Sequence, residues 1–185
     1  MAESRRSWVL PIILLAAGVA LGYSLRTGGS DHGSFPSIGD RIIGPFFCPE
    51  DRCSSVVIDW IERANESIDL AIYSFTLDSI GDALVRAHDR GVRVRVIMER
   101  EQLNRWSEYS RLRDAGVKVK LDGNPAYMHN KFMVIDGRVV LTGSYNYTKQ
   151  ADTRNDENLL ILVGEDVAGA YEAEFNEMWS GVFGG

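Results

Sequence analysis

The chain is poor in residues that build metal centres: of its 185 residues, 3 are histidine and 2 are cysteine. A structural zinc site takes four closely spaced Cys or His ligands, whereas His32 and His88 lie apart from Cys48 and Cys53, without ligand spacing. The sequence has no internal repeat. It also lacks an excess of positive charge, since 20 Lys and Arg against 26 Asp and Glu give a net charge of −6. That balance argues against avid, non-specific binding to nucleic acid.

Positive charge is nevertheless concentrated in the middle of the chain, and much of the negative charge lies near the C-terminus. The central segment therefore has two equal interpretations, a local basic cleft or a mixed, solvated surface. The central cations are Arg93, Arg95, Arg105, Arg111, Arg113, Lys118, Lys120, Lys131, Lys149 and Arg154. The acidic residues near the C-terminus are Glu165, Asp166, Glu172, Glu174 and Glu177.

The N-terminus carries the longest apolar run of the chain. Residues 8–25 are uncharged and mostly apolar, and they follow Arg5 and Arg6. Such a run is at the lower limit for a membrane span and also fits a secretory signal. We favour an uncleaved membrane helix in residues 1–26, with a cleaved signal as the alternative. The charge pattern places the following domain outside the cytoplasm, anchored to the membrane or secreted. Residues 27–44, rich in Gly, Ser and Pro, are expected to be a flexible linker.

Residues 45–185 are expected to form one α/β domain, because about 140 residues are enough for a hydrophobic core. Apolar residues at helical spacing alternate along this segment with β-rich runs. That pattern predicts a mixed β-sheet flanked by helices. The predicted helices cover residues 54–65, 78–90, 106–115 and 166–179. The predicted strands cover residues 68–75, 92–98, 117–121, 132–135, 139–141 and 158–163.

One stretch near the C-terminus brings together an imidazole, an ammonium, a hydroxyl and an amide. It has the pattern H-x-K-x4-D-x6-G-S-x-N, and its fixed residues are His129, Lys131, Asp136, Gly143, Ser144 and Asn146. Such a set suits attack on a phosphodiester, because an imidazole can form a bond to phosphorus while the other groups hold the phosphoryl oxygens. The alternative is an ordinary hairpin with polar residues at its ends.

The spacing within this stretch predicts how its side chains meet. Residues 136–137 are Asp-Gly between two β-rich runs, which is typical of a two-residue hairpin turn. His129 and Lys131 are two residues apart, so on a strand they project to the same face. The return strand brings Ser144 back to that end of the hairpin, and Gly143 would let the backbone approach an anion closely.

The pattern resembles the HKD signature of the phospholipase D superfamily. The likeness includes residues 127–132, 143–148 and 155–158, and it is strongest to the small single-motif members. Those members are bacterial endonucleases and the mitochondrial cardiolipin hydrolase of animals. The resemblance runs from residue 46 to residue 179 and so covers nearly the whole predicted domain. The motif is specific for the superfamily, but it says little about the substrate.

The resemblance implies a role for each residue of the motif. It makes His129 the nucleophile that forms a phosphohistidine, and it places Lys131, Ser144 and Asn146 around the phosphate. It also implies that Glu157 holds the catalytic imidazole by its second nitrogen. A carboxylate there would fix the tautomer and support the imidazolium. The alternative for Glu157 is a solvated carboxylate at the start of a strand.

Asp136 belongs to the catalytic motif but lies at the turn. We expect it to fix local geometry through hydrogen bonds rather than to take part in the chemistry. No metal or other cofactor is expected, because side chains can supply the charge stabilisation.

The motif occurs once, since neither His32 nor His88 has a lysine two residues later. Family members work with two copies that face each other across a twofold axis. One histidine attacks phosphorus, while the other protonates the leaving oxygen and later activates water. A single copy therefore implies a homodimer that shares one active site at an isologous interface.

Three smaller features have more than one interpretation. Cys48 and Cys53 bracket four residues, and in an exported domain they predict a local disulfide, with free thiols and metal binding as alternatives. His88 near a helix end is expected to interact with the helix dipole. Tyr145 and Tyr147 either stack on a base or pack in the core, and core packing is favoured.

Three functional hypotheses remain at this point. A metal-independent nuclease acting on DNA or RNA comes first, favoured by the likeness to bacterial endonucleases and by the interspersed arginines. A phospholipase D or cardiolipin hydrolase is the alternative, favoured by the membrane segment and the net acidity. A catalytically idle, membrane-tethered binding module comes third, and the intact His129, Lys131, Asn146 and Glu157 argue against it.

Overall fold

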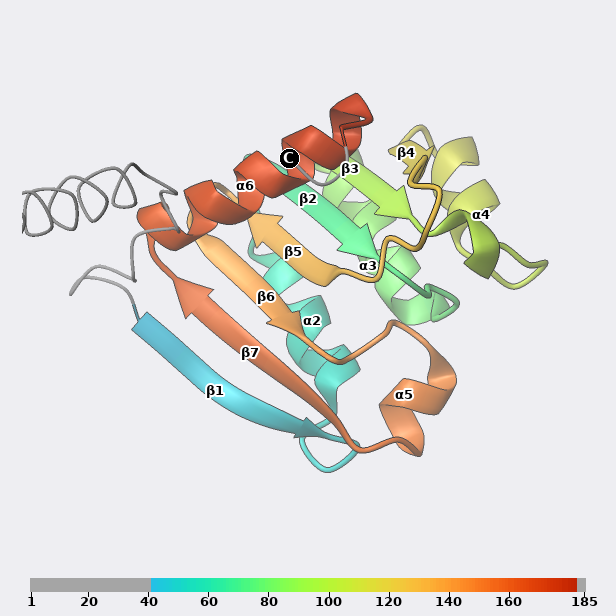
Figure 1. The fold of residues 1–185 in the computed structure, drawn as a ribbon. Helices are drawn as coiled ribbons and strands as arrows, with labels where there is room; N and C mark the ends of the chain where they lie inside the picture. The colour runs from blue at the N-terminus through green and yellow to red at the C-terminus, as the bar shows by residue number, and fades with distance from the viewer. Residues whose placement is uncertain (1–40, 183–185) are drawn as a thin grey trace, which may run out of the picture. The chain divides into compact units, whose positions relative to one another are not determined.

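Seven strands form a mixed β-sheet with helices on both of its faces (Figure 1). The computed structural model describes residues 41–182. Its strands are β1 (Arg41–Cys48), β2 (Ser67–Ile72), β3 (Arg93–Met98), β4 (Lys118–Leu121), β5 (Lys131–Ile135), β6 (Val139–Gly143) and β7 (Glu157–Val163). Its helices are α2 (Cys53–Glu62), α3 (Asp78–Asp89), α4 (Tyr109–Asp114), α5 (Lys149–Thr153) and α6 (Glu165–Ser180), with a 3-10 turn η1 (Arg100–Gln102).

The strand order explains which ends of the strands lie side by side. The order is β1-β7-β6-β5-β2-β3-β4. The strands β2, β3 and β4 are parallel neighbours, and α3 and α4 supply the crossovers that parallel strands require. Every other neighbouring pair is antiparallel. The carboxyl ends of β2, β3 and β6 and the amino ends of β5 and β7 therefore lie at the same end of the sheet.

Each face of the sheet packs against its own hydrophobic cluster. β2 is buried along its whole length because both of its faces are covered. Its side chains alternate, so Leu70 and Ile72 join the cluster with α2 and α3, while Ala71 joins the cluster with α6. Phe175 anchors α6 to the sheet and is 0% exposed. Burying such a ring stabilises the fold by about 1.5–3 kcal/mol.

The predicted mixed sheet with flanking helices is confirmed. The closing helix was predicted over residues 166–179 and is α6. Helix α4 begins at Tyr109, three residues later than predicted, because Asn104 accepts the N–H of Trp106 in the preceding turn. The η1 and α5 elements were not predicted, since segments of 3 and 5 residues are too short for a helical period to show.

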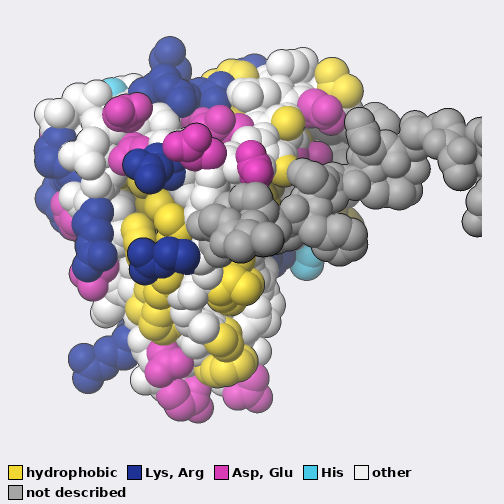
Figure 2. All heavy atoms as spheres, turned by 90° about the vertical axis from the view of Figure 1, so that its left-hand side faces the viewer, with side chains coloured by type: hydrophobic (Ala, Val, Ile, Leu, Met, Phe, Trp, Pro, Cys, Tyr) yellow, Lys and Arg dark blue, Asp and Glu magenta, His cyan; other side chains and the backbone are white. Residues whose placement is uncertain are grey.

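The predicted linker is wrong at its C-terminal end. Residues 41–44 belong to β1, which pairs antiparallel with β7. The sequence hid this strand because it is an edge strand, in which Ile42 and Phe47 are 69% and 56% exposed. A register shift between Ile43 and Phe46 also breaks its alternation. Figure 2 shows this side of the molecule, where hydrophobic side chains gather in a band beside Lys and Arg.

The predicted membrane helix in residues 1–26, and most of the predicted linker, lie outside the described residues. Within residues 41–182, no helix is long and apolar enough to cross a bilayer. The structure joins Cys48 to Cys53 in a disulfide, with the two Cα atoms 5.7 Å apart. That bond ties the end of β1 to the first residue of α2.

The ion pairs on β3 favour a mixed surface over a basic cleft. Arg93 and Arg95 both bind Asp69, which is 1% exposed, with N–O distances of 3.1 and 2.7 Å. Arg111 of α4 likewise pairs with Asp82 of α3. Two guanidinium groups around one buried carboxylate offset its desolvation, so these cations serve the fold rather than a polyanion.

Candidate active site

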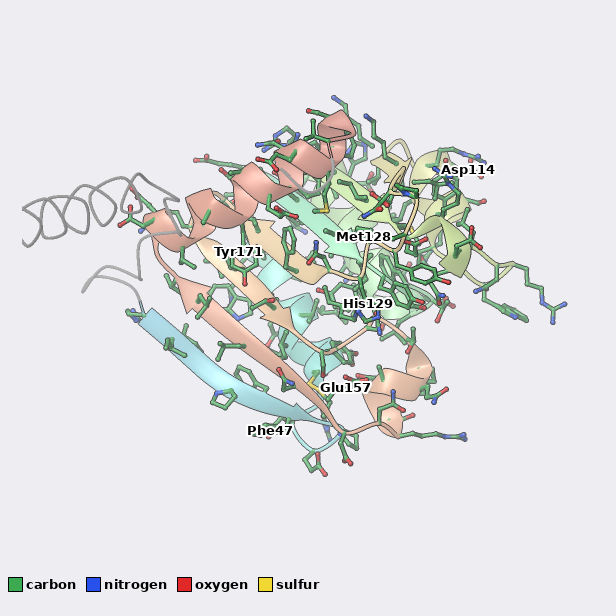
Figure 3. All side chains as sticks on the ribbon, viewed as in Figure 1. Phe47, Asp114, Met128, His129, Glu157 and Tyr171 are labelled. Atoms are coloured by element: carbon green, nitrogen blue, oxygen red, sulfur yellow. A yellow bond between two sulfur atoms is a disulfide. The ribbon has the colours of Figure 1, made fainter. Side chains whose placement is uncertain are left out.

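Apart from Asp136, the motif residues come together where β2 and β6 end and β5 and β7 begin. The register places Ile72 opposite Lys131 and Gly143 opposite Leu159. The hairpin and β7 therefore meet the distant end of β2 at one end of the sheet. Figure 3 shows His129 and Glu157 at this end, with Met128 next to His129.

His129 is exposed and lies between Tyr73 and Lys131. The ring centroids of His129 and Tyr73 are 4.3 Å apart. The Lys131 Nζ lies 3.1 Å from Nδ1 and 3.4 Å from Nε2 of His129, and it donates to the His129 carbonyl at 2.7 Å. An ammonium can only donate, and it lies within reach of both ring nitrogens, so it can bind whichever nitrogen of the neutral imidazole carries the lone pair. Burial lowers the pKa of Lys131, while the carboxylate of Glu157 acts in the opposite direction.

Glu157 and Ser144 are bound to each other. The Ser144 hydroxyl donates to Oε2 of Glu157, and Asn155 donates to Oε1 at 3.0 Å. Within residues 41–182, no hydrogen bond joins Glu157 to His129, and the single proton of Ser144 is directed to Glu157 instead of to an open phosphate site. The sheet is the reason, because the Ser144 N–H donates to the carbonyl of Asn158 and so holds Ser144 beside the start of β7.

Asn146 is oriented by the chain that leaves β2. Its Oδ1 accepts the backbone N–H of Ser74 at 3.1 Å. An asparagine amide has one accepting and one donating end, so this bond fixes Nδ2 as the end that a ligand can use. Within the described part of the chain, no acceptor binds Nδ2. Asn146 therefore has the geometry of a donor held ready for a phosphoryl oxygen.

Asp136 lies at the far end of the hairpin from His129. Its carboxylate accepts the backbone N–H groups of residues 65–67 at 2.8–3.3 Å, which ties the hairpin to the start of β2. Asp136 and Gly137 both have positive φ, 52° and 59°, as a primed hairpin turn requires. The loop is one residue longer than predicted, since Ile135 pairs with Val139.

Other residues near the motif serve packing. Gly143 has a φ of 149°, and a side chain there would collide with the carbonyl of Asn158. The glycine is therefore required by the close contact of β6 with β7, while its expected role in anion approach stays a prediction. Tyr145 and Tyr147 are 1% and 3% exposed, so they belong to the core and cannot stack on a base. Burial raises the pKa of both hydroxyls.

Three residues around His129 were missed by sequence reasoning. The carboxylate of Glu99 accepts the N–H of Met128 at 2.7 Å, one residue before the imidazole. Gln102 donates to the Tyr73 hydroxyl at 3.0 Å. Tyr73 and Glu99 directly follow β2 and β3. Position alone was a usable signal, because residues after parallel strands gather at the carboxyl end of the sheet.

A cavity of about 430 Å³ opens beside His129, and its lining is acidic. Asp122 is 4% exposed, and its Oδ1 has no hydrogen-bond partner in the described part of the chain. Glu174 and Glu177 contribute two exposed carboxylates from α6. Among residues 41–182, no three His, Cys, Asp or Glu side chains are grouped as metal ligands. The cavity lining is Asp122, Asn124, Tyr127, Met128, His129, Asn130, Glu174, Glu177, Met178 and Val182.

Comparison with known proteins identifies the family. Residues 57–179 match the family described as "Cardiolipin synthase, PLD-like domain". The chain belongs to the phospholipase D superfamily. Within that superfamily it is 41% identical over 136 residues to the mitochondrial cardiolipin hydrolase of Xenopus tropicalis, covering 71% of this chain and 65% of the hydrolase. It is 34% identical over 141 residues to a phospholipase D of Rickettsia typhi, covering 76% and 69%.

The phospholipase D fold is also seen in a solved structure that the match covers almost completely. Nuc from Salmonella typhimurium, a phospholipase D family member, has a TM-score of 0.72 and 29% identity, covering 76% of this chain and 95% of Nuc. By contrast, the chain spans only 55–65% of the length of two cardiolipin hydrolases that it matches. Membership of the superfamily is thus established, while the substrate is a matter for proposal.

Proposed function

We propose that this protein is a metal-independent phosphodiester hydrolase that acts through a phosphohistidine on His129. The proposal rests on a group of side chains at one end of the sheet. There the exposed imidazole of His129 lies 3.1 Å from the ammonium of Lys131, and Asn146 is oriented as an amide donor. Lys131 and the Nδ2 of Asn146 stabilise the charge on the phosphoryl oxygens. Ser144 holds the carboxylate of Glu157 in place. Glu157 in turn supports the positive charge on Lys131.

The reaction takes two steps. The lone pair of the His129 imidazole forms a nitrogen–phosphorus bond, and the bond from phosphorus to the leaving oxygen breaks. A second imidazole gives its proton to that oxygen. The second imidazole, now neutral, takes a proton from water as the water oxygen attacks phosphorus. The nitrogen–phosphorus bond then breaks, and both histidines return to their starting states.

The second imidazole is the partner subunit's His129. Attack and leaving-group protonation need groups on opposite sides of phosphorus, and residues 41–182 contain one other histidine, His88, near the C-terminal end of α3. A homodimer with an isologous interface at this end of the sheet supplies the missing group. The exposure of His129 supports this arrangement.

Nucleic acid is the first substrate class that we propose. The likeness to small bacterial endonucleases supports it, and so does an exposed aromatic side chain at the same end of the sheet. Trp106 is 66% exposed in the segment after β3, and the Arg105 guanidinium lies 4.7 Å from its ring. An exposed ring with a neighbouring cation is the usual support for an unpaired base.

Phospholipid is the second candidate, favoured by a different observation. The carboxylates of Glu174, Glu177 and Asp122 line the cavity beside His129. A nucleic-acid strand that crossed this cavity would bring a row of phosphates against them, whereas a phospholipid head group brings only one or two, and its hydrogen-bond donors can bind the carboxylates. A membrane helix in residues 1–26, with the domain outside the cytoplasm, would hold the site near lipid.

Substitution of His129, assayed on several substrates, distinguishes a nuclease from a phospholipid hydrolase. We expect the parent protein to hydrolyse a phosphodiester in the presence of EDTA, and His129→Ala to lower kcat about a thousand-fold or more. The full chain is assayed on single-stranded DNA, single-stranded RNA and cardiolipin liposomes, with His88→Gln as the matched histidine control.

Each result assigns one function. Loss confined to DNA or RNA supports a nuclease, and loss confined to liposomes supports a lipid hydrolase. A parent protein inactive on every substrate would overturn the proposal in favour of an idle binding module. Activity that vanishes in EDTA and returns with an added divalent ion would contradict the metal-independent step.

A further inference from the structure

The segment Glu99–Gln102, which follows β3, contacts both supports of the catalytic imidazole. We propose that Glu99 and Gln102 are positioning residues for His129: Glu99 holds the backbone that carries the imidazole, and Gln102 holds the ring on which it packs. The inference rests on the proposed phosphodiesterase function and adds two residues outside the HKD motif to it.

Glu99 is anchored so that it can position others. Its own N–H donates to the carbonyl of Ile72 at 3.3 Å, at the tip of β2. Its Oε1 accepts the N–H of Glu101 at 2.9 Å, and its Oε2 accepts the N–H of Met128 at 2.7 Å. One carboxylate thus joins the end of β3, the η1 turn and the chain entering β5.

Met128 turns this anchoring into a fixed position for His129. It is 3% exposed and packs in the cluster beneath α6. Its side chain is therefore held by the core while its backbone N–H is held by Glu99. On the other side, the carbonyl of Asn130 accepts the N–H of Tyr73 at 3.0 Å. Neighbours fixed on both sides leave the exposed imidazole of His129 little freedom except about its own side-chain bonds.

Gln102 acts on the face of the imidazole. Its Nε2 donates to the hydroxyl of Tyr73 at 3.0 Å, and the Tyr73 ring lies 4.3 Å from the His129 ring and 4.9 Å from the Lys131 Nζ. The Tyr127 ring, whose centroid is 6.2 Å away, packs edge-on against Tyr73 as well, but Gln102 is the group that binds its hydroxyl. The two ends of one short segment therefore constrain the nucleophile through its backbone and through the neighbouring tyrosine ring.

The burial of Glu99 indicates that its hydrogen bonds have a role beyond stabilising the fold. The residue is 2% exposed, and within residues 41–182 no Lys, Arg or His forms an ion pair with it. A buried carboxylate without a cation is costly unless hydrogen bonds compensate it. An apolar residue after β3 could be buried at a lower cost in free energy, but it could not bind the Met128 N–H. Displacing a reacting group by about 1 Å can slow a reaction about 100-fold, which gives the contact a catalytic use.

The test compares Glu99→Gln with Glu101→Gln, since Glu101 is exposed two residues away on the same turn. Gln offers one accepting oxygen for two N–H groups, so we expect kcat to fall about 10- to 100-fold with KM changed less than about two-fold. The full chain is assayed on bis(4-nitrophenyl) phosphate. A shift in the midpoints of the pH–rate profile reports the lost charge of Glu99, whereas a fall in the plateau value of kcat reports displacement of the imidazole.

Hydrogen exchange of the peptide spanning residues 127–131 provides a readout that does not depend on activity. Glu99→Gln should speed its exchange, and Glu101→Gln should not. Wild-type kcat together with unchanged exchange would overturn the inference, whereas an inactive parent protein would overturn the proposed function instead. A rise in KM with kcat unchanged would also contradict a positioning role.

A second pair of variants covers the case in which Glu99→Gln does not fold. Gln102→Leu and Tyr73→Phe each remove one side of the same hydrogen bond at the edge of the site. Each should lower kcat about 3- to 10-fold, and the double variant should be no slower than the slower single variant, because both remove one interaction. Additive losses would show that Gln102 does not act through Tyr73.

Discussion

At the scale of single residues, the motif divides into groups that face a substrate and groups that hold the fold. His129, Lys131 and Asn146 have donors or lone pairs directed at one end of the sheet. Asp136 accepts three backbone N–H groups at the other end. A residue can therefore belong to a catalytic signature without approaching the reaction, because the signature also records how the hairpin is fixed.

Asp136→Asn should destabilise the protein by about 1–2 kcal/mol at pH 7, because charge-assisted hydrogen bonds to backbone N–H are lost. Burial opposes ionisation of Asp136, but the N–H groups of Ser67, Glu66 and Asn65 outweigh it and lower the pKa. A lowered carboxyl pKa contributes stability above the unfolded pKa, near 4, and that stability is lost as pH falls through the folded pKa. Urea denaturation at pH 7 and pH 3 measures both effects, with exposed Asp59→Asn as control. Equal losses at the two pH values would contradict this account.

At the scale of elements, α3 and α4 are joined through a buried acidic residue. Glu108 is 3% exposed, its N–H donates to the carbonyl of Phe75, and its carboxylate accepts from Arg111 at 3.0 Å. Any side chain at Gly81 of α3 would collide with this carboxylate. The glycine in the first half of α3 thus makes room for Glu108 at the start of α4.

Glu108 should make the stability of the protein depend on pH. Burial and, to a smaller extent, the neighbouring Asp78 together raise the pKa of Glu108 to about 7. The folded state then binds a proton that the unfolded state releases near pH 4.5, so the free energy of unfolding falls as pH rises from about 4.5 to 7. Glu108→Gln should abolish this slope, as measured by thermal melts at each pH, while Glu101→Gln should retain it. An unchanged slope in Glu108→Gln would assign the dependence to other groups.

At the scale of the whole molecule, one subunit supplies one HKD imidazole, whereas the proposed reaction needs two. Mixing wild-type and His129→Ala chains in equal amounts, by unfolding and refolding together, should give three dimers in a 1:2:1 ratio. If each dimer shares one site, activity should be roughly a quarter of that of the same amount of wild-type protein. Independent sites would give roughly half. A fully active monomer in sedimentation and assay would rule out the shared site.

The sequence predicted the residues of the HKD motif, the mixed sheet and the hairpin, because spacing and periodicity are local properties of the chain. It did not predict β1, since an edge strand with exposed Ile42 and Phe47 has no buried face to mark it. The sequence predicted that Glu157 would bind His129 and that Ser144 would bind the phosphate. The pairing of β6 with β7 instead places Ser144 and Glu157 together, and they bind each other.

The sequence by itself therefore determined the chemistry proposed for this protein, because the identities and spacing of His129, Lys131 and Asn146 follow from one short stretch. Only the tertiary structure decided which groups surround that chemistry. Glu99, Gln102 and Tyr73 lie 27 or more positions before His129 in the chain and reach it because β2, β3 and β5 share one sheet. Contacts between strands depend on register and strand order, and neither is encoded in any single segment.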